Sequence, residues 1–407
     1  MTPTVALYEQ DAFLQEFDSR IAAVDRGGPL PRIALEATAF YPEGGGQPCD
    51  TGLLLIAGQD PLGWAVTEVH TVGGVIWHTL NTLDGEHPLP DAVQPGCAVR
   101  GQVNWRRRFD HMQQHTGEHI LSGTLHRLYG AQNVGFHIGA AGVRMDTDIP
   151  LSWQQLRMAE VQANQVIWSD APVQCTVYPE QAAVDKTYRS KKELDGPVRI
   201  VEIPGGDCCA CCGTHVLRAG QVGQIKILAA EHYKGGMRLT VACGRRALEE
   251  SEAMRTRQQR IGALLSAKAD ETANAVERLN AEKAALDYNY YGLCQQLFEL
   301  LAQKAAETPD TPALVTLPGL EAAWLARLAN RLAAAVPGTV CAALSANERG
   351  TGYCIASGSV DVRPLTKALN AALNGKGGGK PNSCQGSCAG AEPQQVEAAL
   401  RQLLAEG

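Results

Sequence analysis

The alternation of apolar and polar positions in residues 1–95 is that of short β-strands. Two such runs, at 65–72 and 75–80, are separated only by Gly73-Gly74. Runs of this kind joined by two glycines predict a β-hairpin with a two-residue turn. A further run at 53–57 follows a segment that contains three consecutive glycines. We therefore expect residues 1–95 to form a β-rich, barrel-like domain.

Residues 96–244 combine strand-like alternation with helix-like spacing of apolar positions. Helices are predicted at 110–129 and 151–169, and Ser152 stands where an N-cap is expected. Strands are predicted at 99–105, 198–203, 225–229 and 237–242. This order predicts an α+β domain whose strands pair mostly antiparallel.

Residues 245–307 differ in character from the segments on either side. The segment is charged, rich in alanine and free of proline. Leucine recurs every seven positions, at Leu279, Leu286, Leu293 and Leu300. A heptad row sustained for four repeats predicts a coiled-coil arm or a helical hairpin, and an amphipathic helix packed on its own domain is the alternative. A homodimer would form through this arm or through the domain that follows it.

Residues 308–407 begin with a proline-containing linker and continue with alternating strands and helices. The strands are predicted at 313–317, 338–344 and 353–357, and the helices at 321–336, 362–373 and 394–404. This alternation predicts a small α/β domain. The glycine-rich stretch 374–381 is expected to be a loop. The chain as a whole is therefore predicted to be α+β, with domains at 1–95, 96–244, 245–307 and 308–407.

Composition and charge narrow the class of protein. The formal net charge is −7, so any binding of nucleic acid would depend on local clusters of Lys and Arg. Thirteen cysteines without an apolar N-terminal signal indicate a reducing compartment, where thiols pack in cores or bind metals. No stretch approaches the roughly 20 apolar residues of a membrane helix. These features predict a cytoplasmic globular protein without a membrane segment.

Two short motifs almost a hundred residues apart carry the candidate chemistry. They read His115-Thr-Gly-Glu-His119 and Cys211-Cys-Gly-Thr-His215. Residues four apart share one face of a helix, and three His with one Cys form a ligand set that zinc takes in tetrahedral geometry. The sequence therefore predicts one metal site. The spacing leaves open whether Cys208, Cys209 or Cys212 replaces Cys211, and what His111 contributes one turn before the first motif.

The first motif also has the pattern His-x-x-Glu-His of a class of zinc peptidases. In that alternative Glu118 is the general base, and the third zinc ligand is a glutamate in a later helix. The sequence offers Cys211 and His215 in place of that glutamate, which makes the peptidase the weaker hypothesis.

The paired motifs resemble the zinc motif of the alanyl-tRNA editing domain in its free-standing AlaX form. Residues 38–52 resemble the glycine-rich N-terminal motif of that family, and 105–115 resemble the lead-in to its first zinc pair. Residues 212–227 resemble the second half of the zinc motif. Residues 377–386 resemble the C-terminal domain of alanyl-tRNA synthetase, which is also attached to DHH phosphoesterases. The resemblance covers nearly the whole chain in order and is to the long form of AlaX.

This resemblance implies a trans-editing hydrolase that deacylates tRNA for alanine mischarged with serine, or with glycine. It implies one zinc ion per chain, held by His115, His119, Cys211 and His215. With four protein ligands the ion has no open position, so we expect it either to orient the substrate or to lose one ligand when the substrate binds. A non-catalytic RNA-binding module with structural zinc is a further alternative. Glu118 stands where the family often has an uncharged residue, so the resemblance assigns it no catalytic role.

The resemblance also indicates residues for selectivity and for tRNA. Thr38 matches the threonine with which the family tells serine from alanine. Gln47 and His137 are further candidates by position, beside the glycine-rich loop of Gly44, Gly45 and Gly46. Candidate tRNA contacts are the basic residues Arg106, Arg107, Arg108, Lys191, Lys192, Lys376 and Lys380. The stretch 376–380 could also bind a nucleotide phosphate through backbone N–H groups, although it lacks the ending of a Walker motif.

Overall fold

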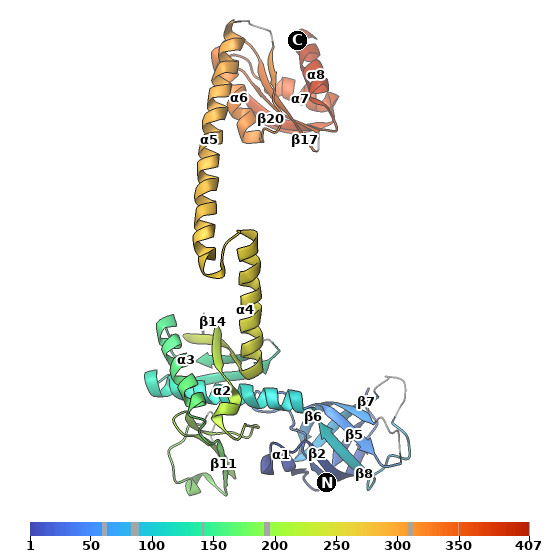
Figure 1. Cartoon of the computed structure of the whole chain (residues 1–407). Helices are drawn as coiled ribbons and strands as arrows, with labels where there is room; N and C mark the ends of the chain where they lie inside the picture. Colours follow the sequence, from blue (N-terminus) through green and yellow to red (C-terminus); the bar gives the residue numbers. More distant parts are fainter. Residues whose placement is uncertain are drawn as a thin grey trace. The chain divides into compact units, whose positions relative to one another are not determined.

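The computed structural model describes residues 1–58, 63–82, 89–140, 142–190, 196–307, 312–348 and 350–406. The chain forms two compact units, Met1–Arg260 and Ile261–Gly407 (Figure 1). Both contain helices and sheets, so the predicted α+β class is confirmed. The finer domain boundaries stay predictions. In the described parts, no helix is both long enough and apolar enough to cross a membrane.

A closed barrel occupies the start of the first unit, with strands in the order β2-β3-β7-β6-β5-β8. The strands are β2 (Glu16–Asp25), β3 (Arg32–Leu35), β5 (Gly52–Ile56), β6 (Trp64–Val72), β7 (Val75–Thr82) and β8 (Ala98–Val103). The predicted hairpin is confirmed, because Val72 pairs with Val75 across two glycines that both have positive φ. Beside the barrel, β1 (Val5–Ala6) and α1 (Leu7–Gln10) precede β2, and β1 pairs with β4 (Ala37–Thr38).

Helix α2 (Trp105–Tyr129) leads from the barrel to the rest of the first unit (Figure 1). It begins five residues earlier than the sequence predicted, because Asn104 acts as its N-cap and accepts a hydrogen bond from the backbone N–H of Arg107. It ends at Gly130, whose φ of 71° is a left-handed conformation that glycine adopts without strain. The next helix, α3 (Trp153–Trp168), starts at the predicted cap Ser152.

Two sheets pack around α2. The first has the order β14-β15-β10-β9, and the second has the order β11-β12-β13. All pairings within them are antiparallel, as predicted. The strands are β9 (Asn133–Gly139), β10 (Gly142–Thr147), β11 (Gln174–Tyr178), β12 (Val198–Ile203), β13 (Asp207–Ala210), β14 (Ile225–Tyr233) and β15 (Gly236–Cys243). The short helices η1 (Gln181–Ala183) and η2 (Ala219–Val222) lie in the connections.

Helix α4 (Gly244–Leu264) follows β15, and η3 (Ala269–Glu271) leads into α5 (Thr272–Glu307). The second unit contains a sheet in the order β16-β17-β18-β20-β19. Its strands are β16 (Ala313–Thr316), β17 (Cys341–Asn347), β18 (Gly350–Ala356), β19 (Gly375–Lys380) and β20 (Ser383–Ala389). Helices α5 and α6 (Ala322–Ala335) share one apolar core with the sheet. Helices α7 (Arg363–Ala372) and α8 (Pro393–Glu406) share another.

The face of α5 that packs on the second unit is not the heptad row. Cys294, Phe298 and Ala302 are buried against α6, whereas Leu279, Leu286, Leu293 and Leu300 are exposed. A helix in this range is therefore present, and the coiled coil stays a prediction.

The prediction of a loop at 374–381 was wrong, because this stretch forms β19 and pairs antiparallel with β20. Its glycines have no Cβ, so the backbone of β19 lies closer to β20 than a residue with a side chain would permit. A Cβ at Gly377 would lie 2.5 Å from the backbone oxygen of Gln385, and one at Gly379 would lie 2.4 Å from that of Ser383. The run of glycines thus permits close packing of an edge strand, which composition alone does not reveal.

Candidate metal centre

Helix α2 and the segment after β13 bring the four predicted ligands together. His115 and His119 lie one turn apart on α2, and Cys211 and His215 follow the end of β13. One ligand atom from each of the four residues lies within 4.8 Å of those of the others. The three histidines are buried, with at most 4% of their surface exposed. This group contains no carboxylate, although the peptidase alternative requires one as a zinc ligand.

The Nδ1 atom of each histidine contacts an oxygen outside the cluster. For His115 the partner is Oε1 of Gln47 at 2.8 Å, and for His119 it is Oδ2 of Asp207 at 3.1 Å. For His215 the partner is Oγ1 of Thr116 at 3.2 Å. A ring that donates its Nδ1 proton keeps the lone pair on Nε2, and this arrangement is usual for histidines that bind metals. Each ring therefore has Nε2 available to the cluster.

The inner atoms of the cluster have the environment of a metal site. Nε2 of His215 is buried and has no hydrogen-bond partner among the described residues. Sγ of Cys211 lies 3.4 Å from Nε2 of His115. A buried polar atom without a partner is costly, and an ion bound between these atoms would remove that cost. Three imidazole nitrogens and one sulfur fit a tetrahedral metal ion.

The electrostatics of the cluster favour a thiolate. Burial alone would raise the pKa of Cys211, but the charges and hydrogen bonds of His115 and His119 lower it well below its usual range. Burial opposes charge on His119 as well, and the Cys211 thiolate and Asp207 outweigh it and raise the pKa of that ring. Burial and the neighbouring His115 lower the pKa of His215 to about 3. The thiolate of Cys211 and the neutral ring of His215 are forms that bind metals, and His119 would release its Nε2 proton when an ion binds.

Asp207 connects the cluster to Arg189. Nε and Nη2 of Arg189 donate to the two carboxylate oxygens of Asp207 at 2.8 and 2.7 Å, and Nη2 also donates to Ser122. Burial raises the pKa of Asp207, but hydrogen bonds from His119 and Arg189 outweigh it and lower the pKa to about 2. The stability that this carboxylate contributes is therefore complete above its usual pKa near 4 and is lost as the pH falls toward 2.

Replacing Asp207 with asparagine is expected to weaken metal binding by about 10- to 100-fold, since the substitution removes the carboxylate that orients His119. Competition with a chelator of known affinity measures the change. Asp170→Asn is the matched control, because Asp170 pairs with Arg218 on the surface. Equal affinities for the Asp207 variant and the unsubstituted protein would contradict the assignment.

Gln47 links the glycine-rich loop to both halves of the cluster. Its Oε1 accepts from His115 and, at 3.2 Å, from the backbone N–H of Thr214, and its Nε2 donates to Oγ1 of Thr214 at 2.8 Å. The backbone packs closely at two glycines beside these contacts, Gly213 and Gly46. A Cβ at Gly213 would lie 2.2 Å from Cε1 of His115, and a Cβ at Gly46 would lie 2.4 Å from the backbone oxygen of Phe136. Glycine is therefore required at both positions.

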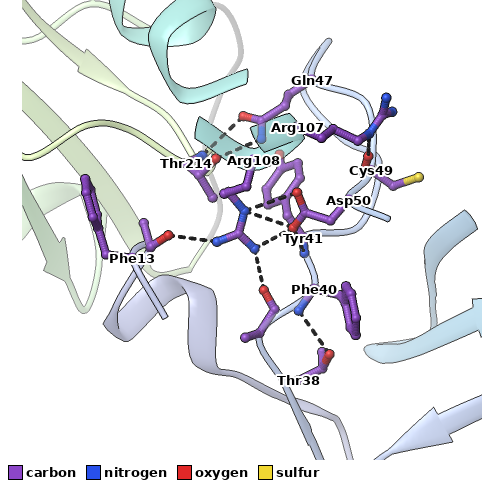
Figure 2. A network of polar contacts seen from close by, with 12 residues as sticks. Phe13, Thr38, Phe40, Tyr41, Gln47, Cys49, Asp50, Arg107, Arg108 and Thr214 are labelled. Carbon is purple, nitrogen blue, oxygen red and sulfur yellow. Dashed lines mark hydrogen bonds and ion pairs between the residues drawn. The ribbon is translucent and has the colours of Figure 1, made fainter. Parts of the chain in front are cut away.

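A buried ion pair fixes the same loop to α2 (Figure 2). Both Arg108 and Asp50 are fully buried, and the guanidinium donates to both oxygens of the carboxylate. Further hydrogen bonds from Arg108 go to the backbone oxygens of Ala12 and Ala39. Asp50 in turn accepts from the backbone N–H of Tyr41 at 2.7 Å. The structure therefore places Arg108 in the interior, where it cannot contact a tRNA phosphate as the sequence predicted.

A cavity of about 420 Å³ adjoins the cluster. Three of the candidate ligands line it, together with residues from α1, the glycine-rich loop, α2, β9 and the segment around β12 and β13. These residues include Tyr8, Tyr41, Gly44, Gly45, His115, Glu118, His119, Ser122, Phe136, Arg189, Arg199, Cys209, Cys211 and Cys212. Phe136 stacks on His115, with ring centroids 4.8 Å apart.

None of the three residues predicted for selectivity lines this cavity. Thr38 is fully buried. Its Oγ1 lies 2.9 Å from Nε2 of His78 and accepts a hydrogen bond from the backbone N–H of Phe40. Gln47 is buried behind His115, and His137 is exposed on β9. The selectivity assignments stay predictions. Phe136 was missed, although the alternation that turns Ile138 inward on β9 also turns Phe136 inward and His137 outward.

The other candidate residues are placed as follows. Cys209 forms a second possible group with His119 and Asp207, whereas Cys208 and Cys212 belong to neither group. His111 is buried outside the cluster, and burial with the nearby arginines lowers its pKa to about 3.

The remaining basic residues differ in exposure. Arg106 is exposed, and Arg107 is half-buried with its Nε donating to the backbone oxygen of Cys49. Lys376 and Lys380 are exposed on β19. Lys191 and Lys192 lie outside the described residues.

Known families match two parts of the chain. Residues 198–261, which include Cys211 and His215, match the threonyl and alanyl tRNA synthetase second additional domain, tRNA_SAD. Residues 310–406 match the DHHA1 domain.

Similar curated proteins fall into two groups. The alanine–tRNA ligase of Pyrococcus abyssi is 36% identical over 61% of this chain and 26% of the ligase. The alanyl-tRNA editing protein AlaX-L of Pyrococcus horikoshii is 34% identical over 60% of this chain and 59% of its own length. The alanyl-tRNA editing protein Aarsd1 of Danio rerio is 29% identical over 74% of each chain. The chain thus spans less than two thirds of the length of AlaX-L and about a quarter of that ligase. The chain therefore combines matches to the tRNA_SAD and DHHA1 domains, and the curated proteins to which it is similar include alanyl-tRNA editing proteins.

Proposed function

We propose that this chain is a trans-editing aminoacyl-tRNA deacylase that hydrolyses the ester of serine, or of glycine, on tRNA for alanine. The observation that carries the proposal is the cluster of three histidines and one cysteine beside a cavity large enough for an aminoacyl group. The editing proteins among its relatives support the same reaction class. Because charged tRNA is the substrate, the proposal places the chain in the cytoplasm.

One zinc ion per chain is part of the proposal, held by Nε2 of His115, His119 and His215 and by Sγ of Cys211. When bound, it would supply positive charge that orients the ester and stabilises the oxyanion formed during hydrolysis. The residues of the chain perform the remaining tasks. Gln47, Asp207 and Thr116 hold the three rings in place. No serine or cysteine nucleophile is needed, because an aminoacyl ester is already activated toward water.

The cavity walls would determine how the aminoacyl group lies. Phe136 covers one face of His115 and offers an apolar wall, while Ser122 and Arg189 offer polar groups on the side of Asp207. The proposal retains Thr38, Gln47 and His137 as residues that influence selectivity. Since none of them lines the cavity, their influence would have to pass through neighbours such as Phe40 and His115.

Contacts with tRNA are proposed for exposed basic residues, namely Arg106 in the first unit and Lys376 and Lys380 in the second. Backbone N–H groups of β19 are proposed as donors to a nucleotide phosphate. A homodimer is proposed through the exposed leucine row of α5, which would form a coiled coil with a second copy. Sedimentation of the full chain and of a variant with Leu286 and Leu293 replaced by Glu would test this dimer.

The test of the proposed function is a deacylation assay with seryl-tRNA and alanyl-tRNA, both made with tRNA for alanine. The metal-loaded chain is expected to release serine at least about 100-fold faster than buffer does and to spare alanine. Treatment with a chelator is expected to abolish the reaction, and added zinc to restore it. Release of serine at the rate of the buffer control would refute the proposed deacylase activity. The outcome would then favour the RNA-binding module with structural zinc.

A further inference from the structure

Glu118 is a buried carboxylate in the wall of the cavity that neither the cluster nor its supporting contacts use. It shares one face of α2 with His115, His119 and Ser122, and all four line the cavity. Only 2% of its surface is exposed. A buried carboxylate is expensive unless a cation or hydrogen-bond donors compensate it.

The protein compensates Glu118 only in part. Its Oε1 accepts a hydrogen bond from Nδ2 of Asn133. That donor is fixed, because Oδ1 of Asn133 accepts from the backbone N–H of Gly135 at 3.0 Å. No ion pair among the described residues includes Glu118. The carboxylate therefore has a neutral amide donor but no direct ion pair, although the charges of His119 and Arg189 act on it from a distance.

Nearby charges are already paired with one another. The guanidinium of Arg189 lies in the same wall, but its Nε and Nη2 donate to Asp207 and Ser122, and its charge acts on Glu118 without a direct ion pair. Asp207 has both oxygens occupied by Arg189 and His119. Two other carboxylates that line the cavity, Glu9 and Glu43, are exposed and thus screened by solvent. Glu118 is consequently a buried carboxylate in the cavity wall that forms no direct ion pair among the described residues and could accept a cation from the cavity.

We propose that Glu118 binds the α-ammonium group of the aminoacyl ester. This inference rests on the proposed function, because an aminoacyl ester carries a cation next to its carbonyl carbon. Glu118 lines the same cavity as His115, His119 and Cys211, so a carboxylate that binds the ammonium would hold the carbonyl close to the metal cluster. Glu118 would thereby be a specificity-determining residue that separates aminoacyl esters from esters without an amino group. It is not assigned to proton transfer.

The decisive comparison uses two substrates that differ only at the ammonium. One is seryl-tRNA, and the other carries the 2,3-dihydroxypropanoyl ester, in which a hydroxyl replaces the ammonium. For Glu118→Gln we expect kcat/KM on seryl-tRNA to fall by about 10- to 100-fold, the range for losing a charged hydrogen bond. On the dihydroxypropanoyl ester the variant and the unsubstituted chain should agree within about 3-fold. Glu43→Gln, at an exposed carboxylate of the same cavity, should leave the ratio between the two substrates unchanged.

Other outcomes overturn the inference. An equal loss on both esters would mean that Glu118 acts on the reacting groups in general, for instance as a base. No loss on either ester would mean that the ammonium binds elsewhere. The glutamine side chain can still accept from Asn133, so the fold should persist. Metal content and thermal unfolding of the variant establish this, and Glu118→Ala serves as the second variant if the first does not fold.

A binding measurement separates this inference from the proposed function. tRNA carrying serine through a stable 3′-amide, and the same tRNA with the hydroxyl analogue, can be titrated without any turnover. Weaker binding of the serine amide alone to Glu118→Gln supports the ammonium site even if the chain proves inactive in deacylation. Equal effects on the two amides would overturn the site, whatever the deacylation assay shows.

Discussion

Replacing Cys211 with serine is expected to abolish stoichiometric metal binding, whereas replacing the adjacent Cys212 is expected to preserve it. Cys211 belongs to the group of four ligand residues, and the neighbouring His115 and His119 lower the pKa of its thiol well below the usual range. Cys212 is exposed and outside that group. A serine hydroxyl is a far poorer ligand for zinc than a thiolate, so the loss should reach several orders of magnitude in affinity.

Metal analysis of the purified full-length chain measures this effect directly. We expect about one zinc per chain for the unsubstituted protein and for Cys212→Ser, and less than about 0.1 for Cys211→Ser. Serine release from seryl-tRNA should fall in parallel, by about 100-fold or more. Retention of zinc by Cys211→Ser, with loss in a Cys209→Ser variant, would instead place the ligand at Cys209 in the second group with His119 and Asp207.

Replacing Arg108 with alanine is expected to destabilise the chain by about 3–5 kcal/mol. The substitution leaves the Asp50 carboxylate buried and without its cation, which is the costly way to break a buried ion pair. It also removes the hydrogen bonds that Arg108 donates to the backbone oxygens of Ala12 and Ala39. The glycine-rich loop should become more mobile as well. Because Gln47 in this loop holds His115 in place, metal affinity should fall together with stability.

Urea unfolding followed by circular dichroism measures the change in the free energy of unfolding. Arg106→Ala is the matched control, because Arg106 lies two positions earlier on α2 and is exposed. Its effect should stay within about 0.5 kcal/mol. If Arg108→Ala cost less than about 1 kcal/mol, the buried pair would not be what anchors the glycine-rich loop.

The metal cluster and most helices and strands could be predicted because their signals are local. The spacing of His115 and His119 places both on one helical face, and Ser152 marks the start of α3 by its capping chemistry. The beginning of α2 was misplaced because the cap Asn104 was not recognised, and β19 was missed because its glycines were interpreted as a loop. In β19 the deciding fact is the space beside β20, which is a property of the folded chain.

The sequence by itself determined which residues have the chemistry to bind a metal and that helices and antiparallel strands would present them. Only the tertiary structure decided what surrounds them, because contacts such as that of Gln47 with His115 join residues far apart in the chain. It placed Arg108 in a buried ion pair rather than on the surface, and it placed Glu118 in the wall of the cavity. Burial and charge pairing depend on which segments meet in the fold, and a linear pattern of residue types does not contain that information.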